Sequence, residues 1–392
     1  MEISYRSNIL KFYIFSFILG IHTVRAVYIP FMMDWGGLSF AQIMILQSYF
    51  TAMILLLEIP SGAIADFLGR RVGLSLSAVA ISAAAFTYSI IPNFFLFMLA
   101  ETLWAFGSAL MSGTNDAFVY FSLKSYGNEK NLSKILGRSR TMNLIALTIS
   151  APIGSLIAQF ISLPFTMTCL SIIYVNAFIV SLTFKEPKFI NDNYKREHYL
   201  RIIISGFKEL IGNKKLRILA LDWIPINVLI FFMFWTYQVY LQAINIPIGW
   251  FGFILAVMNI VNAVFSIIIP HLLNSSKNKK IFLILINLIN GITYTLLGLT
   301  TIIPLGFALI LIIVAFGYTR YLIFVDGINL QIASENRATV LSTINMFGSL
   351  LRAILYPVVG LLVELSVFYV FLITGILILF FTMLTRSKSE YL

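Results

Sequence analysis

The chain contains twelve separate runs of mostly apolar residues, each long enough to cross a lipid bilayer as a helix. A helix needs about 20 apolar residues to span the hydrocarbon core, and such runs recur between residues 9 and 385. Because lipid offers no hydrogen-bond partner to the backbone, these runs are expected to be helical. The composition agrees, since only 11% of the residues are charged whereas soluble domains carry about 25%. The sequence therefore predicts an all-α membrane protein with twelve transmembrane helices.

Lysine and arginine lie in every second loop between the apolar runs. The alternate loops, such as 34–39, 91–93 and 245–247, contain neither residue. Because Lys and Arg mark the cytoplasmic side of membrane proteins, this alternation predicts that both termini are cytoplasmic. Because the basic residues lie in these loops, the net charge of +11 reflects membrane topology. It therefore argues against nucleic acid as a partner.

The longest polar stretch divides the chain into two halves of six predicted helices. The predicted parts are an N-terminal bundle over 1–184, a cytoplasmic linker over 185–216 and a C-terminal bundle over 217–392. Apolar residues recur at helical spacing within the linker, at Tyr199, Leu200, Ile203, Phe207, Leu210 and Ile211. This pattern predicts an amphipathic helix on the membrane surface, which either couples the two halves or is a plain tether.

A motif follows the second predicted helix and consists of Gly62, Asp66, Gly69, Arg70 and Arg71. The glycines permit a tight turn, and Asp66 can accept hydrogen bonds from the N-terminal amides of another helix. The motif resembles the signature loop of the major facilitator superfamily, although Phe67 stands where the family usually has a basic residue. The flanking residues 58–61 resemble a subset of bacterial and archaeal members, and the resemblance leaves open whether this chain belongs to a drug-efflux-like or an uncharacterised prokaryotic subset.

This resemblance implies two six-helix bundles, alternating access and a loop that holds the halves together in the outward-facing state. It also implies that Asp66 lies near the start of the eleventh helix. The alternative interpretation is that Arg70 and Arg71 only mark the inner side of the membrane.

Charged residues within membrane spans are costly to bury, so each is a functional candidate. There are seven: Arg25, Glu101, Asp116, Asp222, Arg320, Asp326 and Arg352. Most lie on predicted helices 1, 4, 7 and 10, which line the central cavity in the fold that the chain resembles.

The depths of these charges in the predicted helices suggest partners. We expect an ion pair between Arg25 and Glu101, and either an Asp326–Arg352 or an Asp222–Arg320 contact in the second half. Asp116 is a further candidate partner for Arg70. A carboxylate either carries a proton during transport, for which Glu101 and Asp116 are favoured, or only holds helices together.

Uncharged polar residues within the spans are candidates for the substrate cavity, although buried amides often bond only a neighbouring helix. They are His22, Tyr28, Gln47, Asn115, Asn143, Asn227, Trp235, Tyr237, Gln238, Asn259 and Asn262. His22 shares a helix face with Arg25 and can titrate. The segment 150–155 weakly resembles the bend of antiporters, which favours export, but a simple proline kink explains it equally well.

Several classes of protein are excluded by missing motifs. The sequence has no phosphate-binding loop, no cluster with metal-ligand spacing and no nucleophile motif. We therefore expect no enzymatic activity and no cofactor other than a proton gradient.

The expected function is secondary transport of a small organic solute, with proton-coupled export ahead of proton-coupled uptake. A membrane receptor or a lipid-handling protein is the alternative from another class. The expected partners are a small-molecule substrate and membrane lipid, without nucleic acid, for a monomer in a prokaryotic plasma membrane.

Overall fold

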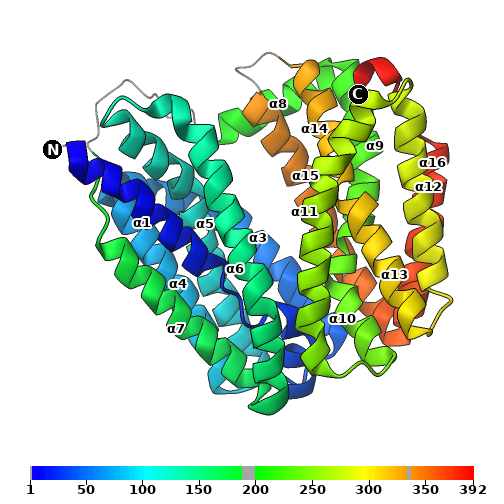
Figure 1. Cartoon of the computed structure of the whole chain (residues 1–392), viewed down its shortest axis with the longest axis horizontal. Helices are drawn as coiled ribbons and strands as arrows, with labels where there is room; N and C mark the ends of the chain where they lie inside the picture. The colour runs from blue at the N-terminus through cyan, green and yellow to red at the C-terminus, as the bar shows by residue number, and fades with distance from the viewer. Residues whose placement is uncertain (1, 188–198, 333–336) are drawn as a thin grey trace. The chain divides into compact units, whose positions relative to one another are not determined.

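The structure, a computed structural model, describes residues 2–187, 199–332 and 337–392. Within these ranges the side chains of residues 2–4, 59, 66, 199–204 and 338 lie outside the description. Every regular element among the described residues is a helix (Figure 1). Eleven helices of the described chain are long and apolar enough to cross a membrane, and α16 (Val367–Met383) is a shorter apolar helix. The predicted all-helical membrane fold is confirmed.

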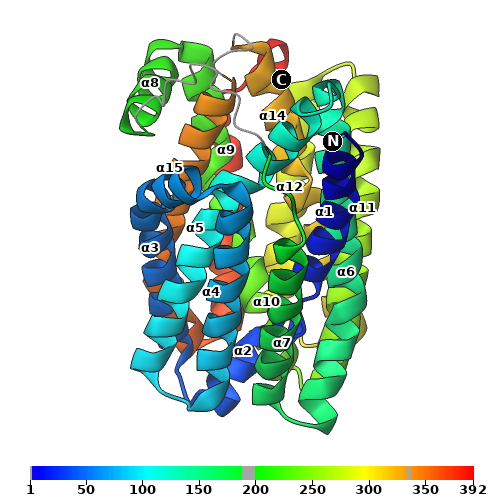
Figure 2. The same cartoon turned by 90° about the vertical axis from the view of Figure 1, so that its left-hand side faces the viewer.

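The helices form two compact units. The first contains Met1–Tyr194 together with Pro247–Ala256, and the second contains Lys195–Ile246 and Val257–Leu392. Figure 2 shows the long helices of the first unit side by side. Its elements up to residue 182 are α1 (Glu2–Gly20), η1 (Arg25–Val27), α2 (Tyr28–Pro30), η2 (Phe31–Trp35), α3 (Phe40–Leu68), α4 (Arg70–Ile90), α5 (Phe94–Lys124), η3 (Glu129–Asn131), α6 (Leu132–Phe160) and α7 (Leu163–Leu182).

The remaining elements begin with the helix that was expected in the linker. They are α8 (Tyr199–Gly212), α9 (Lys214–Phe231), α10 (Met233–Ala243), η4 (Ile248–Trp250), α11 (Phe251–Ser275), α12 (Lys279–Leu297), α13 (Ile303–Ile313), η5 (Val314–Tyr318), α14 (Arg320–Leu330), α15 (Arg337–Leu365), α16 and η6 (Ser389–Tyr391). The start of α11 belongs to the first unit.

Polar side chains fix the first turns of several helices. Ser39 and Gln42 form a capping box before α3, in which each side chain bonds the backbone amide of the other. Asn93 accepts two backbone hydrogen bonds at the start of α5. These caps satisfy amides that the helices leave without an intrahelical partner.

The predicted loop after the second helix is much shorter than its sequence suggests. Helix α3 continues through Pro60 to Leu68, and only Gly69 separates it from α4. The φ angle of Gly69 is 97°, a conformation that a residue with a Cβ atom adopts only with strain. The turn is therefore a single glycine, and the motif residues before it belong to a helix.

Three predicted single helices are interrupted. The first is irregular over residues 21–24, where α1 gives way to η1, and the seventh breaks at Phe232 between α9 and α10. The tenth contains a π-helical stretch, η5. Such interruptions free backbone groups and are tolerated in membrane helices only where neighbouring helices satisfy them. They occur frequently at functional sites.

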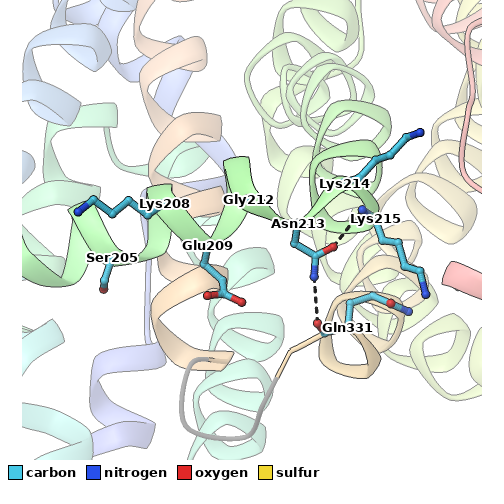
Figure 3. A pocket seen from close by; sticks show the side chains of 8 residues that line it. All are labelled: Ser205, Lys208, Glu209, Gly212, Asn213, Lys214, Lys215 and Gln331. Atoms are coloured by element: carbon cyan, nitrogen blue, oxygen red, sulfur yellow. Dashed lines mark hydrogen bonds between the residues drawn. The ribbon is translucent and has the colours of Figure 1, made fainter.

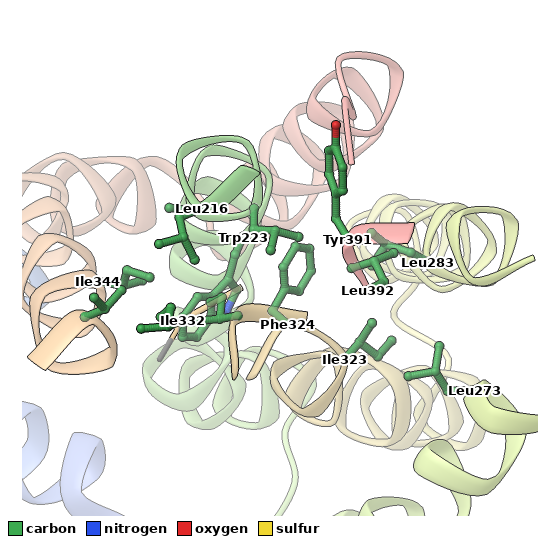
Figure 4. Packing of buried hydrophobic residues seen from close by; sticks show 14 of the residues in the cluster. Leu216, Trp223, Leu273, Leu283, Ile323, Phe324, Ile332, Ile344, Tyr391 and Leu392 are labelled. Carbon is green, nitrogen blue, oxygen red and sulfur yellow. The ribbon is translucent and has the colours of Figure 1, made fainter. Parts of the chain in front are cut away.

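Each unit has its own buried core. In the first unit Phe12 and Phe15 of α1 pack with Phe118 of α5 and Phe184. In the second unit a larger cluster gathers residues of α9, α12 and α14 around Trp223 and Phe324 (Figure 4). Tyr391 and Leu392 from the C-terminal segment are buried in the same cluster.

Candidate functional site

The carboxylate of Glu101 lies buried on α5, with 4% of the residue exposed. Tyr28 donates its hydroxyl hydrogen to Glu101 Oε1 over 3.1 Å, and Gln47 Nε2 donates to the same oxygen over 3.0 Å. Gln47 Nε2 also lies 3.1 Å from the Tyr28 hydroxyl, so the three side chains form a closed triangle. The side chain of Tyr88 on α4 is also buried, and it interacts electrostatically with the Glu101 carboxylate. The partners that hold this carboxylate are therefore neutral.

An aromatic pair lies next to the Glu101 triangle. His22 stacks on Trp104 with ring centroids 5.7 Å apart, and Trp104 shares a face of α5 with Glu101 because it is three residues further on. The His22 Nδ1 atom is buried and has no hydrogen-bond partner among the described residues. Most buried polar atoms in folded proteins have a partner, so Nδ1 is a position where a water molecule or a bound group can donate a hydrogen bond.

The irregular part of the first helix is clamped against two neighbours. The backbone amide of His22 donates to Ser150 Oγ over 2.9 Å, and Thr23 Oγ1 donates to the backbone oxygen of Thr166 over 2.7 Å. Gly154 of α6 lies so close that an added Cβ would come within 1.8 Å of the Thr23 carbonyl oxygen. The segment that carries His22 and Tyr28 therefore has a fixed position between α6 and α7.

Asn143 and Gly20 extend this contact along α6. Asn143 Nδ2 donates to the Ser16 backbone oxygen over 3.2 Å, and the Asn143 backbone leaves no room for a Cβ atom at Gly20. Asn143 thus bonds a neighbouring helix, which is the second of the two roles expected for a buried amide.

The motif between α3 and α4 is organised by Glu186, which follows α7. The Glu186 carboxylate accepts hydrogen bonds from the backbone amides of Arg70 and Arg71 over 2.7 and 2.8 Å. A Cβ atom on Gly69 would lie 2.9 Å from the same carboxylate. The arrangement is an anion at a helix N-terminus, where the helix dipole favours negative charge. The side chain of Asp66 lies outside the described residues, so its expected contact stays a prediction.

The motif arginines bond within the first unit. Arg71 Nη2 donates to the Leu182 backbone oxygen over 2.7 Å, and the Arg70 guanidinium lies 4.5 Å from the centre of the Phe121 ring. Asp116, the other proposed partner of Arg70, is exposed and makes no ion pair in the described part of the chain. The expected Asp116–Arg70 contact is therefore wrong.

The expected Arg25–Glu101 ion pair is also wrong. Glu101 bonds Tyr28 and Gln47, and Arg25 lies where it interacts electrostatically with His22 and Tyr174. The prediction assumed a regular first helix. Because that helix is irregular at 21–24, Tyr28 faces α5 in place of Arg25.

In the second unit, the guanidinium of Arg320 is 1% exposed and is held by three oxygen atoms. Nε donates to Asn287 Oδ1 over 2.7 Å, Nη1 to the Trp223 backbone oxygen over 3.3 Å and Nη2 to the Asp222 backbone oxygen over 2.7 Å. The Phe324 ring covers the guanidinium at 4.5 Å. Arg320 therefore ties α14 to α9 and α12.

The backbone oxygen of Asp222 accepts the hydrogen bond from Arg320, whereas the Asp222 carboxylate binds the C-terminal segment. Asp222 Oδ2 accepts hydrogen bonds from the backbone amides of Arg386 and Ser387 and from Ser387 Oγ, over 3.0, 2.7 and 2.6 Å. The expected Asp222–Arg320 contact exists, but it does not pair the two charges directly. Asp222 acts here as an anchor for residues 386–387.

Arg352 and Asp326 do not meet. Arg352 Nη2 donates to Ser349 Oγ over 2.7 Å, and its guanidinium lies 4.6 Å from the centre of the Phe231 ring. Asp326 is exposed on α14 and makes no ion pair among the residues that the structure describes. The expected Asp326–Arg352 contact is therefore wrong.

The other polar candidates are spread over several helices. Gln238 Nε2 donates to the buried Tyr237 hydroxyl over 3.3 Å, so these two lie together on α10. Trp235 is buried on the same helix, whereas the remaining candidates are only partly buried, and they are Asn115, Asn227, Asn259 and Asn262. Asn115 Oδ1 and Asn259 Nδ2 are buried atoms without a hydrogen-bond partner in the described structure. The described residues contain no group of His, Cys, Asp or Glu side chains suited to a metal ion.

Sequence reasoning missed four residues that complete these sites: Tyr88, Trp104, Glu186 and Asn287. Trp104 carried a usable signal, because it lies three residues after a charge within a span. The others had none, since Tyr88 and Asn287 resemble many residues of apolar helices and Glu186 lies in a charged loop.

Comparisons with known proteins agree with this architecture. The sequence matches the model of the Major Facilitator Superfamily over residues 12–354. The fold is similar to a mutant of the nucleoside transporter NupG, with a TM-score of 0.80, 14% identity and coverage of 97% of this chain and 100% of that one. It is also similar to a bacterial homologue of the human lysosomal transporter Spinster, with a TM-score of 0.74, 14% identity and coverage of 99% and 96%.

A POT family transporter in complex with 5-aminolevulinic acid has a TM-score of 0.68 and 16% identity, with coverage of 97% and 95%. Identities this low show a shared fold alone. A search of curated protein sequences found no match. The family model covers most of the chain, which therefore belongs to the Major Facilitator Superfamily.

Proposed function

We propose that this protein is a proton-coupled secondary transporter that moves a small organic solute by alternating access of its two units. The observation that carries the proposal is the Glu101 triangle, in which a buried carboxylate is held by the neutral side chains of Tyr28 and Gln47. Ionisable groups inside membrane helices are costly and mark ion or proton pathways.

The chemistry of this triangle suits a proton carrier. A carboxylate that is locked to an arginine loses an ion pair when it takes up a proton. Glu101 can gain or lose a proton without breaking such a pair, because Tyr28 and Gln47 bond either form. Tyr28 lies on the irregular first helix, so a change in that helix reaches the carboxylate directly. Glu101 is therefore the proposed site of proton uptake and release.

The neighbouring pair of His22 and Trp104 supports binding of an organic solute next to the proton site. Solved structures with this fold include a nucleoside transporter and a transporter in complex with 5-aminolevulinic acid. These solutes differ in charge and shape, so the fold supports a small organic solute without selecting one.

Export is the favoured direction, on the resemblance of 150–155 to the bend of antiporters, and uptake is the alternative. We propose a monomer in the plasma membrane of a prokaryote, with the basic loops on the cytoplasmic side and no cofactor.

The experiment is solute flux into vesicles with an imposed pH gradient. Purified protein is reconstituted in proteoliposomes that contain a pH-sensitive dye, and uridine and 5-aminolevulinic acid serve as first probes within a wider panel of metabolites. We expect a solute-dependent proton flux in the native protein and its loss in Glu101→Gln. Asp116→Asn is measured beside it, because Asp116 is the other favoured carboxylate and is exposed on the same helix.

Two results contradict the proposal. Native proton coupling in Glu101→Gln would remove Glu101 as the proton carrier. Solute binding without flux, for every probe that binds, would favour a membrane receptor or a lipid-handling protein with the same fold.

A further inference from the structure

A hollow of about 770 Å³ lies in the second unit where α8 meets α9 (Figure 3). Its lining includes three lysines, Lys208, Lys214 and Lys215, and one carboxylate, Glu209. The lining therefore has an excess of positive charge, although it is not purely basic.

The floor of the hollow is fixed by Asn213, which lies between the two helices. Asn213 Oδ1 accepts hydrogen bonds from the backbone amides of Lys215 and Leu216 over 3.0 and 3.3 Å. Asn213 Nδ2 donates to the backbone oxygen of Gln331, at the end of α14, over 3.3 Å. The corner between α8 and α9 is thus tied to the end of α14.

The lysines form no ion pair with Glu209, the carboxylate in the same lining. All three are exposed, and none forms an ion pair within the described ranges. Lys215 lies 5.7 Å from the ring of Tyr391. In Figure 3 the three lysine side chains point in different directions from the corner between α8 and α9 and do not converge on one point.

Lys214 and Lys215 also occupy the first turn of α9, where the helix dipole disfavours cations. Helix stability therefore does not account for these residues. A bound anion would offset the repulsion between the lysines and the helix end.

The surroundings of the hollow suit a position at a lipid surface. Helix α8 has 14 residues, too few to cross a bilayer, and it exposes the apolar side chains of Phe207 and Ile211. Gly206 packs against Thr343 of α15 so closely that a Cβ atom would lie 2.1 Å from Thr343 Oγ1. An amphipathic helix of this kind, fixed to a membrane-spanning helix, lies at the level of the lipid headgroups.

We propose that the hollow between α8 and α9 binds the phosphate of an anionic phospholipid headgroup. The three lysines supply the attraction, and the apolar face of α8 brings the acyl chains alongside. Basic residues next to the cytoplasmic end of a membrane helix attract acidic lipids, and here Lys208 lies on α8 while Lys214 and Lys215 begin α9. This site is separate from the Glu101 triangle and does not depend on which solute is transported.

The test is native mass spectrometry of the full chain in mild detergent. The protein is titrated with phosphatidylglycerol, with phosphatidylcholine of the same acyl chains, and with inorganic phosphate. We expect the native protein to retain phosphatidylglycerol in preference to phosphatidylcholine. The double variant Lys208→Gln with Lys214→Gln is expected to lose about thirtyfold in affinity, since each lysine contributes about 1 kcal/mol near an acidic lipid surface.

Two further variants sharpen the result. Glu209→Gln removes the opposing charge and is expected to tighten phosphatidylglycerol binding about fivefold. The double variant Lys130→Gln with Lys134→Gln removes two exposed lysines from the first unit and is expected to leave the affinity unchanged. Thermal unfolding of each variant checks that the fold is retained.

Equal loss in both double variants would overturn the proposal, because binding would then follow net charge and not the hollow. Unchanged binding in the Lys208 and Lys214 variant would overturn it as well. If inorganic phosphate binds as tightly as phosphatidylglycerol and depends on the same lysines, the source of the phosphate is a soluble compound and the lipid assignment is wrong.

Discussion

The contact between Gly154 and the irregular first helix predicts that even one added methyl group is not tolerated there. In Gly154→Ala the new Cβ atom would lie 1.8 Å from the carbonyl oxygen of Thr23, whereas ordinary contact begins at 3.4 Å. The obstacle is main chain, and it is held on both sides. Hydrogen bonds from the His22 amide to Ser150 and from Thr23 Oγ1 to Thr166 resist its displacement.

The size of the effect follows from two opposing terms. Overpacking of a filled interior destabilises by about 1 to 3 kcal/mol, and a clash with a fixed backbone lies at the upper end. Replacing a helix-interior glycine by alanine stabilises the helix by about 1 kcal/mol, because alanine has the higher helix propensity. The expected net loss is about 2 kcal/mol, or about thirtyfold in the folding equilibrium.

Gly137 offers a matched control on the same helix. It lies in α6, and an added Cβ atom would meet nothing within 4 Å. Gly137→Ala is therefore expected to stabilise the protein by about 1 kcal/mol, which separates the two variants by about 3 kcal/mol.

The measurement is reversible unfolding in mixed micelles with increasing dodecyl sulfate, followed by circular dichroism. Wild-type stability in Gly154→Ala would show that α6 and the first helix are not packed as the structure describes. An equal loss in Gly137→Ala would show that the effect comes from the helix and not from the contact.

Two further predictions concern the ends of the helices. Glu186→Ala removes the anion at the start of α4 and is expected to destabilise the protein by about 1 kcal/mol in the same unfolding assay. Wild-type stability in this variant would mean that the Glu186 carboxylate does not stabilise the start of α4. Asp222→Ala removes the acceptor for three donors of the C-terminal segment and is expected to speed trypsin cleavage after Lys388, while the exposed Asp326→Ala leaves it unchanged. Equal cleavage rates in the two Asp variants would mean that Asp222 does not hold the segment.

The sequence alone determined where the chain meets lipid. Long apolar runs, the placement of Lys and Arg and the pattern of 199–211 are properties of local composition, because the bilayer acts on each helix separately. The motif at 62–71 indicated the family for the same reason, since a tight helix turn needs its glycine wherever the rest of the chain lies. The sequence also identified Glu101 and Tyr28 as buried polar groups within membrane spans.

Tertiary structure decided which of these groups meet. Each expected ion pair that failed, such as Arg25 with Glu101, rested on the depth of residues in a regular helix. A break of a few residues turns the following side chains toward a different neighbour, and it is stabilised by contacts with α6 and α7 that are more than 100 residues away in sequence. Apolar packing sets the faces that helices present to one another, so the partner of a buried charge is a property of the whole bundle and not of its own segment.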